Sequence, residues 1–355
     1  MSEPEGRGAA WTEEGRARDE RGATREGSAL KRPGGERGQH SEPEGRGAAW
    51  TEEGRARDER GATTEGSALK RPGGERGQHS DPDPAGLLDL ACSAAQEAAR
   101  LLVSRRPAGP LGRPQVAETK SSPTDVVTEM DRSAEALIAR LLLAERPGDA
   151  ILGEEGGESG HGRVRWIVDP LDGTVNYLYG LPDWAVSIAA EVDGTVVAGV
   201  VAVPARGEVF TAVLGEGAWS RSAGQPPVAA RCNAPVPLHQ ALVATGFGYT
   251  AARRAVQGEV VAAVLPRVRD IRRGGSCAVD LCSLAMGRVD AYYERGVNYW
   301  DFAAGGLVAT EAGARLGGLN GKLANPELTI AAEPGLFGAL HELLAGLDPE
   351  RDAPC

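Results

Sequence analysis

Two aspartates, Asp169 and Asp172, lie three residues apart at the end of an apolar run, and their type and spacing suit metal chemistry. Carboxylate oxygens are the ligands that hard divalent cations such as Mg²⁺ prefer. Gly173 follows them, and a glycine lets the backbone approach a ligand closely. Thr174 can begin a helix, whose first N–H groups favour an anion. This stretch therefore indicates a site at which a divalent cation and a phosphate group meet.

The element that positions these aspartates is a predicted strand. Residues 166–168 are aromatic or β-branched, which is typical of a buried strand. Pro170 cannot donate a hydrogen bond to a neighbouring strand, so we expect the strand to end at Asp169. The alternative for a D-x-x-D pair is an acidic surface turn. Because these acids interrupt an apolar run and are followed by Gly-Thr, the pattern favours a site.

Three further carboxylates come at the ends of predicted elements, and each has a structural alternative. Residues 150–152 form a short apolar strand that leads into Glu154, which is either a ligand or a solvated side chain. Asp131 lies three residues after Thr128, a spacing that also fits a capping box at a helix start. Asp301 begins another predicted helix, where an aspartate also stabilises the N-terminus.

Composition limits the class of protein. The chain has 355 residues, a formal net charge of −11 and five scattered cysteines without a C-x-x-C pair. The cysteine pattern argues against a disulfide scaffold or a zinc site and favours a reducing compartment. We expect a cytoplasmic protein, since the sequence shows neither a signal peptide nor an apolar run of roughly 18 residues. An acidic chain without a basic stripe is not expected to bind nucleic acid.

The first 80 residues are predicted to be disordered and without chemistry. Residues 2–40 and 41–79 repeat one another, and the only difference is Arg25 in the first copy and Thr64 in the second. The copies are rich in glycine and in charges of both signs, and they contain few apolar residues. Such a sequence lacks an apolar face on which to stack, so a helical solenoid is not expected.

The catalytic domain is predicted over residues 81–350, in two halves. In residues 81–234, β-rich runs joined through Asp193-Gly194 predict a hairpin within an antiparallel sheet, with helices on one side. In residues 235–350, strand-like and helix-like stretches alternate, which predicts an α/β layer structure. The fold class is therefore α+β in the first half and α/β in the second.

The acidic segments, in their order along the chain, resemble the inositol monophosphatase family of magnesium-dependent phosphatases. The matching segments are residues 153–155, 166–174 and 300–305, and the resemblance extends over residues 85–347. Within the family, the chain is most similar to the actinobacterial SuhB-like inositol-1-phosphatases. The resemblance implies a layered α-β-α-β-α sandwich of the sugar-phosphatase type and a homodimer.

The resemblance also implies which residues form the site. It implies two or three Mg²⁺ ions and the ligands Glu154, Asp169, the backbone carbonyl of Leu171, Asp172 and Asp301. The residues implied to bind the substrate are Asp172, Gly173, Thr174, Glu294 and Asp301, with Glu294 holding a sugar hydroxyl. Thr174, with Glu154 beside it and Asp131 behind it, would orient and deprotonate the attacking water. Lys120 matches a family lysine near the metals, with an exposed lysine as the alternative, and lithium would inhibit at a magnesium position.

The expected reaction is hydrolysis of a small phosphorylated polyol by metal-activated water, with myo-inositol 1-phosphate as the substrate. Four alternatives stay open: phosphatases of histidinol phosphate, 3′-phosphoadenosine 5′-phosphate or fructose 1,6-bisphosphate, and a degenerate member with a regulatory binding role. A phosphatase that forms an aspartyl phosphate would need D-x-D-x-T, whereas these acids are three residues apart. A P-loop is absent from the sequence.

Overall fold

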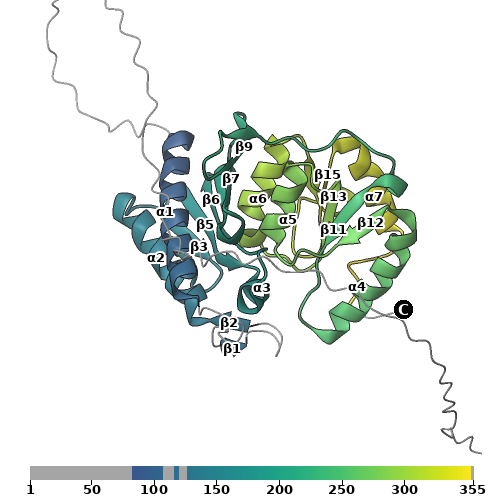
Figure 1. Cartoon of the computed structure of the whole chain (residues 1–355), viewed down its shortest axis with the longest axis horizontal. Helices are drawn as coiled ribbons and strands as arrows, with labels where there is room; N and C mark the ends of the chain where they lie inside the picture. Colours follow the sequence, from purple (N-terminus) through teal and green to yellow (C-terminus); the bar gives the residue numbers. More distant parts are fainter. Residues whose placement is uncertain (1–81, 107–115, 120–125, 353–355) are drawn as a thin grey trace, which may run out of the picture. The chain divides into compact units, whose positions relative to one another are not determined.

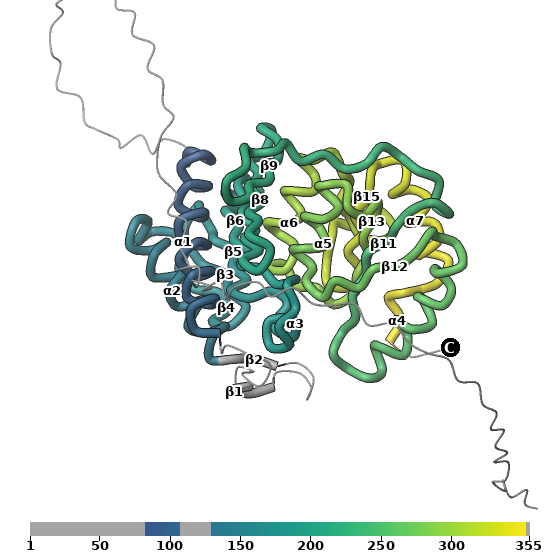
Figure 2. Tube along the Cα trace, in the orientation of Figure 1, coloured from purple at the N-terminus to yellow at the C-terminus, as the bar shows by residue number. Residues whose placement is uncertain are grey.

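The computed structural model describes residues 82–106, 116–119 and 126–352, and both the repeats and Lys120 lie outside this part. Within it, pairs of helices alternate with two sheets (Figure 1). Helices α1 and α2 cover one face of an eight-stranded sheet, whose other face packs on α5 and α6. These two helices also cover a five-stranded sheet, and α4 and α7 cover its far face. The prediction of an α-β-α-β-α sandwich is confirmed, and Figure 2 shows the same order along the chain trace.

The helices have the following bounds: α1 Pro84–Arg105, α2 Glu129–Glu145, α3 Thr174–Tyr179, α4 Ala251–Val264, α5 Cys277–Ala285, α6 Tyr299–Glu311 and α7 Pro334–Ala345. Their starts follow the capping rules. Asp83 accepts hydrogen bonds from the backbone N–H groups of Ala85 and Gly86, both at 3.2 Å, and Pro84 occupies the first turn. No helix of the described residues is long and apolar enough to cross a membrane.

The large sheet has the strand order β10-β9-β8-β7-β6-β5-β3-β4. Its strands are β3 Ala150–Gly153, β4 Gly157–Ser159, β5 Val164–Asp172, β6 Ala185–Val192, β7 Thr195–Val203, β8 Glu208–Val213, β9 Gly217–Ser222 and β10 Val228–Ala229. The predicted hairpin is confirmed, since β6 and β7 meet at Asp193 (φ 50°) and Gly194 (φ 84°), two positive φ values that suit a type I′ turn. The expected antiparallel pairing holds except between β3 and β5, which are parallel.

The small sheet has the order β12-β11-β13-β15-β14. Its strands are β11 Leu242–Thr245, β12 Asp270–Arg272, β13 Ala291–Glu294, β14 Arg315–Gly317 and β15 Thr329–Ala332, and a separate pair comprises β1 Val116–Thr119 and β2 Val126–Thr128. Strand β11 is parallel to both β12 and β13, whereas β15 is antiparallel to β13 and β14. The alternation of strands and helices in this half therefore produces a mixed sheet.

Strand β5 lies in the middle of the large sheet, and both of its faces are buried. Trp166 and Val168 pack toward α1 and α2, while Ile167 packs toward α5 and α6. Successive residues of a strand point to opposite faces, so a strand covered on both faces reads as a continuous apolar run. This burial accounts for the apolar sequence that precedes the two aspartates.

Two expectations about the large sheet were wrong. Strand β5 does not end at Asp169 but continues to Asp172, which pairs with Ala185 after a shift of register. Pro170 lies within that irregularity, where its missing N–H costs the ladder no regular hydrogen bond. The sheet also carries helices on both faces, because α5 and α6 from the second half of the chain cover the face that α1 and α2 leave open.

Candidate active site

A cavity of about 350 Å³ lies at the ends of β3, β5 and β13 and the starts of α5 and α6. Its lining includes eight of the nine residues that the sequence singled out within the described part of the chain: Glu154, Asp169, Leu171, Asp172, Gly173, Thr174, Glu294 and Asp301. The ninth, Asp131, is buried and lies one hydrogen bond behind Thr174. The fold therefore brings together carboxylates that are separated by up to 170 residues of sequence.

The turn from β5 into α3 depends on Gly173. Its φ is 89°, and a Cβ at this position would lie 2.8 Å from the carbonyl oxygen of Asp183. Any other residue would be strained and would collide with backbone. Just before it, the backbone N–H of Leu171 donates to Asp169 Oδ1 at 3.0 Å, which fixes one oxygen of that carboxylate. The turn thus sets the positions of the Leu171 carbonyl and of Thr174.

The hydroxyl of Thr174 lies 3.0 Å from Asp131 Oδ1 and 3.1 Å from the carbonyl oxygen of Leu171. Both neighbours are acceptors, so the hydroxyl donates its proton toward them and keeps its lone pairs for a third group. Asp131 is 1% exposed, at the start of α2. This arrangement can accept a proton from a water in the cavity and direct it toward a buried carboxylate.

Asp172 is held by the start of α5. Its Oδ2 accepts hydrogen bonds from the Ser276 hydroxyl and from the backbone N–H of Ala278, both at 2.7 Å. Burial raises the pKa of Asp172 to about 6, while these hydrogen bonds oppose the rise. Sequence reasoning missed this support, although Ser276 is the N-cap of α5 and a serine before an apolar helical run is a recognisable signal.

Glu154 lies in a glycine turn that a second carboxylate organises. Glu135 of α2 is 8% exposed and accepts hydrogen bonds from the backbone N–H groups of Glu155 (2.9 Å) and Gly156 (2.6 Å). A Cβ at Gly153 would lie 2.5 Å from the Glu135 carboxyl carbon, so the turn closes around this side chain. The sequence did not point to Glu135, because on α2 it looks like an ordinary polar position.

Asp301 fulfils both roles that the sequence left open. It accepts a hydrogen bond from the backbone N–H of Asn298 at 2.5 Å, which caps α6, and its carboxyl group also lines the cavity. Asp169 and Asp301 are within hydrogen-bond reach of each other. Burial raises the pKa of both well above the usual range, and the charges of Glu154 and Asp172 add to the rise. Two such carboxylates cannot both ionise without a compensating positive charge.

The donor set fits Mg²⁺. No three His, Cys, Asp or Glu side chains in the described part of the chain are already grouped as a preformed metal site. Nevertheless Glu154, Asp169, Asp172 and Asp301 all line one cavity, and the charges of Glu154 and Asp172 raise the pKa of Asp169 and of Asp301. All their ligand atoms, and the adjoining Leu171 carbonyl, are hard oxygens, the type that Mg²⁺ prefers. A divalent cation would supply the positive charge that this partly buried group of acids lacks.

Glu294, at the end of β13, is a separate carboxylate in the same cavity. Burial raises its pKa to about 7, and a hydrogen bond of 3.0 Å from the Tyr292 hydroxyl opposes the rise. A Cβ at Gly246 would lie 2.1 Å from this carboxyl group, so the chain has a glycine where Glu294 needs room. Cys277 also lines the cavity, and burial raises the pKa of its thiol. The thiol is therefore protonated and unsuited to act as a nucleophile.

Much of the remaining lining comes from two segments that sequence reasoning did not assign to a site. They are residues 247–250, between β11 and α4, and residues 295–298, between β13 and α6. Arg253 and Arg273 also contribute, and the guanidinium of Arg273 lies 5.9 Å from the ring centre of Phe247. The sequence did contain one signal for the first segment, namely the glycines that follow β11. A glycine at a strand end often marks a position where a ligand or another stretch of backbone approaches closely.

Comparison with known proteins gives consistent matches. The model of the inositol monophosphatase family matches residues 83–350. The inositol-1-monophosphatase of Mycobacterium leprae is 46% identical over 286 residues, 76% of this chain and 98% of that protein. The Nus factor SuhB of Pasteurella multocida is 37% identical over 238 residues, 66% of this chain and 86% of that protein. The solved structure of Mycobacterium tuberculosis SuhB has a TM-score of 0.64 and 43% identity, covering 76% of this chain and 100% of its own. The family match includes every residue that lines the cavity.

Proposed function

Because this chain belongs to the inositol monophosphatase family, we propose that it hydrolyses myo-inositol 1-phosphate to inositol and phosphate, with two or three Mg²⁺ ions as cofactor. That it is a phosphatase of this family follows from the match and from relatives at 45–46% identity. The observation that carries the proposal is the convergence of four carboxylates beside Thr174 in one cavity. An acidic surface turn, the structural alternative, would not bury these groups together.

The residues divide the chemistry among them. Glu154, Asp169, the Leu171 carbonyl, Asp172 and Asp301 would hold Mg²⁺, which when bound lowers the pKa of water and offsets phosphate charge. Thr174 orients the attacking water through its free lone pairs and passes the proton toward Asp131. The backbone N–H groups of Gly173 and Thr174 would donate hydrogen bonds to the phosphate oxygens. Glu294 accepts a hydrogen bond from a ring hydroxyl.

A phosphate-release screen tests the proposal. The four substrates are myo-inositol 1-phosphate, histidinol phosphate, 3′-phosphoadenosine 5′-phosphate and fructose 1,6-bisphosphate, each with Mg²⁺ and with a chelator. We expect the highest kcat/KM for inositol 1-phosphate and no turnover with the chelator. A higher kcat/KM for another of the four would replace the substrate assignment, and turnover with the chelator would refute the magnesium assignment.

Replacing Glu294 with glutamine is expected to lower kcat/KM for inositol 1-phosphate by about tenfold, the effect of weakening one charge-assisted hydrogen bond. The kcat/KM for p-nitrophenyl phosphate, which lacks ring hydroxyls, should change less than twofold, so the ratio of the two values is the measurement. Glu342→Gln, on the exposed face of α7, is the matched control. Equal losses for both substrates would show that Glu294 does not recognise the ring.

Replacing Glu135 with glutamine is expected to raise the Mg²⁺ concentration for half-maximal activity by about tenfold, within the range seen when supporting groups of metal ligands are changed. The Glu135 carboxylate accepts hydrogen bonds from two backbone N–H groups. Glutamine would present its N–H₂ group to one of them, so the turn that carries Glu154 would lose one hydrogen bond. Glu145→Gln, at the exposed end of the same helix, is the control. An unchanged magnesium dependence in the Glu135 variant would contradict this role.

A regulatory role is the second candidate, because relatives at 37% identity are named Nus factor SuhB. The higher identity to inositol-1-monophosphatases and the full set of cavity carboxylates favour the enzyme. We also propose, from the resemblance and the composition, a cytoplasmic homodimer inhibited by lithium. Residues 81–350 would form its catalytic domain, and residues 1–80 would contribute no chemistry.

A further inference from the structure

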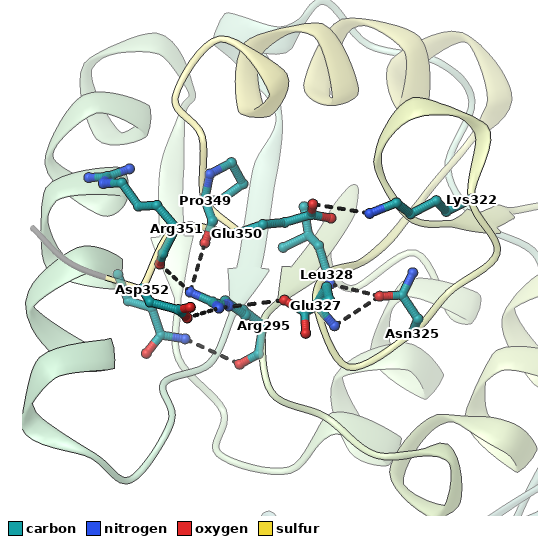
Figure 3. Close-up of polar contacts among 10 residues, drawn as sticks. Arg295, Lys322, Asn325, Glu327, Leu328, Pro349, Glu350, Arg351 and Asp352 are labelled. Carbon is teal, nitrogen blue, oxygen red and sulfur yellow. Dashed lines mark hydrogen bonds and ion pairs between the residues drawn. The ribbon is translucent and has the colours of Figure 1, made fainter.

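Arg295 is a buried arginine whose guanidinium contacts Glu327 and three residues at the C-terminal end of the described chain. Its side chain is 4% exposed, and it directly follows Glu294. The Nη2 group lies 2.7 Å from Asp352 Oδ1, and the Nη1 group donates to the carbonyl oxygens of Pro349 and Arg351 (Figure 3). A buried guanidinium stays charged and is costly without partners. The position of Arg295 therefore depends on residues 349–352.

Gln257 of α4 joins Arg295 to the second segment of the cavity lining. Its side chain is 7% exposed. Its Oε1 accepts a hydrogen bond of 2.9 Å from the backbone N–H of Gly248, and its Nε2 donates to the carbonyl oxygen of Arg295 at 3.3 Å. Gly248 and Arg295 both line the cavity. One amide side chain thus connects the segment after β11 with the segment after β13.

The same helix is tied to the C-terminal residues. The guanidinium of Arg351 lies 2.5 Å from Glu259 of α4, two residues beyond Gln257. Close packing adds to these bonds, because a Cβ at Gly248 or Gly296 would lie 2.7 Å or 2.8 Å from the Arg253 side chain. Helix α4, residues 349–352 and the segments 247–250 and 295–298 therefore form one connected unit. Strand β5, which carries Asp169 and Asp172, and the turn after β3, which carries Glu154, make none of these bonds.

We propose that Gln257, supported by Arg295 and residues 349–352, is a positioning residue that fixes the part of the cavity lining next to Glu294. Through this lining it sets the affinity for the polyol ring, while Glu154 after β3 and the aspartates on β5 keep their own supports. This role rests on the proposed function, since it takes Glu294 as the group that binds the ring. Gln257 and residues 349–352 do not line the cavity themselves, so they act on it through residues 247–250 and 295–298.

The test replaces Gln257 with methionine in the full chain, which keeps the length of the side chain but removes both hydrogen bonds. We expect faster backbone hydrogen exchange in peptides covering residues 246–250 and 294–298, because the Gly248 N–H loses its acceptor. We expect KM for inositol 1-phosphate to rise about tenfold with kcat within about twofold, since lost uniform binding appears in KM. KM for p-nitrophenyl phosphate should stay within about twofold of its value for the unchanged protein.

Two further variants separate positioning from general stability. Gln257→Glu keeps an acceptor for the Gly248 N–H. Relative to the methionine variant, it should therefore slow backbone hydrogen exchange and lower KM for inositol 1-phosphate part of the way toward the values of the unchanged protein. Lys322→Gln removes the 3.2 Å contact between Lys322 and Glu350, a residue of the same C-terminal segment that does not contact Arg295 (Figure 3). This variant should change neither the hydrogen exchange nor the KM. In combination with Glu294→Gln, the methionine variant should add little further loss, because both changes act on the same contact.

The outcomes distinguish this role from the proposed function. Unchanged hydrogen exchange in the methionine variant overturns the positioning role, whatever the substrate is. Faster exchange with an equal rise in KM for both substrates, or with a fall in kcat alone, also overturns the assignment to ring binding. If the unchanged protein hydrolyses p-nitrophenyl phosphate but not inositol 1-phosphate, the proposed substrate fails, and the ring-binding role that rests on it fails too.

Discussion

Replacing Asp169 with asparagine is expected to lower phosphate release by about a thousandfold or more, which is about 4 kcal/mol of transition-state stabilisation. Asp169 is 1% exposed and lies among the other acids, within hydrogen-bond reach of Asp301. The amide keeps the size of the side chain but removes one negative charge from the proposed cation site. Initial rates with inositol 1-phosphate at saturating Mg²⁺ measure the effect.

The same substitution should make the protein more stable without Mg²⁺. Burial and the neighbouring carboxylates raise the pKa of Asp169, so the native state binds this proton more tightly than the unfolded chain does. The free energy of unfolding therefore falls as the pH rises from about 4 through the raised pKa. Asparagine removes this loss, and we expect a melting temperature a few degrees higher at pH 7.5 in the presence of a chelator.

Added Mg²⁺ should raise the melting temperature of the unchanged protein, by mass action, much more than that of the Asp169 variant. Asp193→Asn is a suitable control, because it makes the same change in the exposed β6–β7 turn, where asparagine tolerates the φ of 50°. Asp169 would not be a metal ligand if Mg²⁺ raised the melting temperature of the Asp169 variant as much as that of the unchanged protein. The same conclusion would follow if the Asp169 variant kept more than a tenth of the activity.

The parts of the fold that were predictable from the sequence are those with strong local signals. Asp193-Gly194 predicts its hairpin because few residue pairs adopt two positive φ values. Asp83-Pro84 predicts the start of α1 for a similarly local reason. The acids that follow β3 and end β5 were recognisable because each one interrupts or follows an apolar run. In these cases the local preference and the tertiary environment agree.

The supports of the site were not predictable, because they depend on contacts between distant segments. Glu135 accepts from backbone groups about 20 residues away, and Gln257 reaches the carbonyl of Arg295, 38 residues away. Periodicity reports which face of a helix is apolar but not which polar residue meets a distant backbone N–H. The end of β5 was misjudged for a related reason, since pairing with β6 continues past Pro170 through a bulge.

Replacing Thr174 with alanine is expected to reduce kcat by about a hundredfold or more, the usual range for losing general acid–base assistance. The Thr174 hydroxyl lies 3.0 Å from Asp131 Oδ1, and it is the group that links this buried carboxylate to the cavity. Alanine leaves Asp131 without that link, so a water in the cavity loses its orienting acceptor. All four carboxylates of the proposed magnesium site remain, and the magnesium-induced rise in melting temperature should therefore stay unchanged.

Serine and valine at the same position separate the hydroxyl from the shape of the side chain. Thr174→Ser keeps the hydroxyl and should retain kcat within about tenfold, whereas Thr174→Val keeps the branched shape and should lose as much activity as alanine. A valine variant as active as the serine variant would mean that Thr174 acts only by filling space. If all three variants lost the response to magnesium, the residue would instead support the Leu171 carbonyl, its second neighbour at 3.1 Å. The expected pattern, with lost turnover and retained magnesium binding, belongs to a residue that handles the proton of the attacking water.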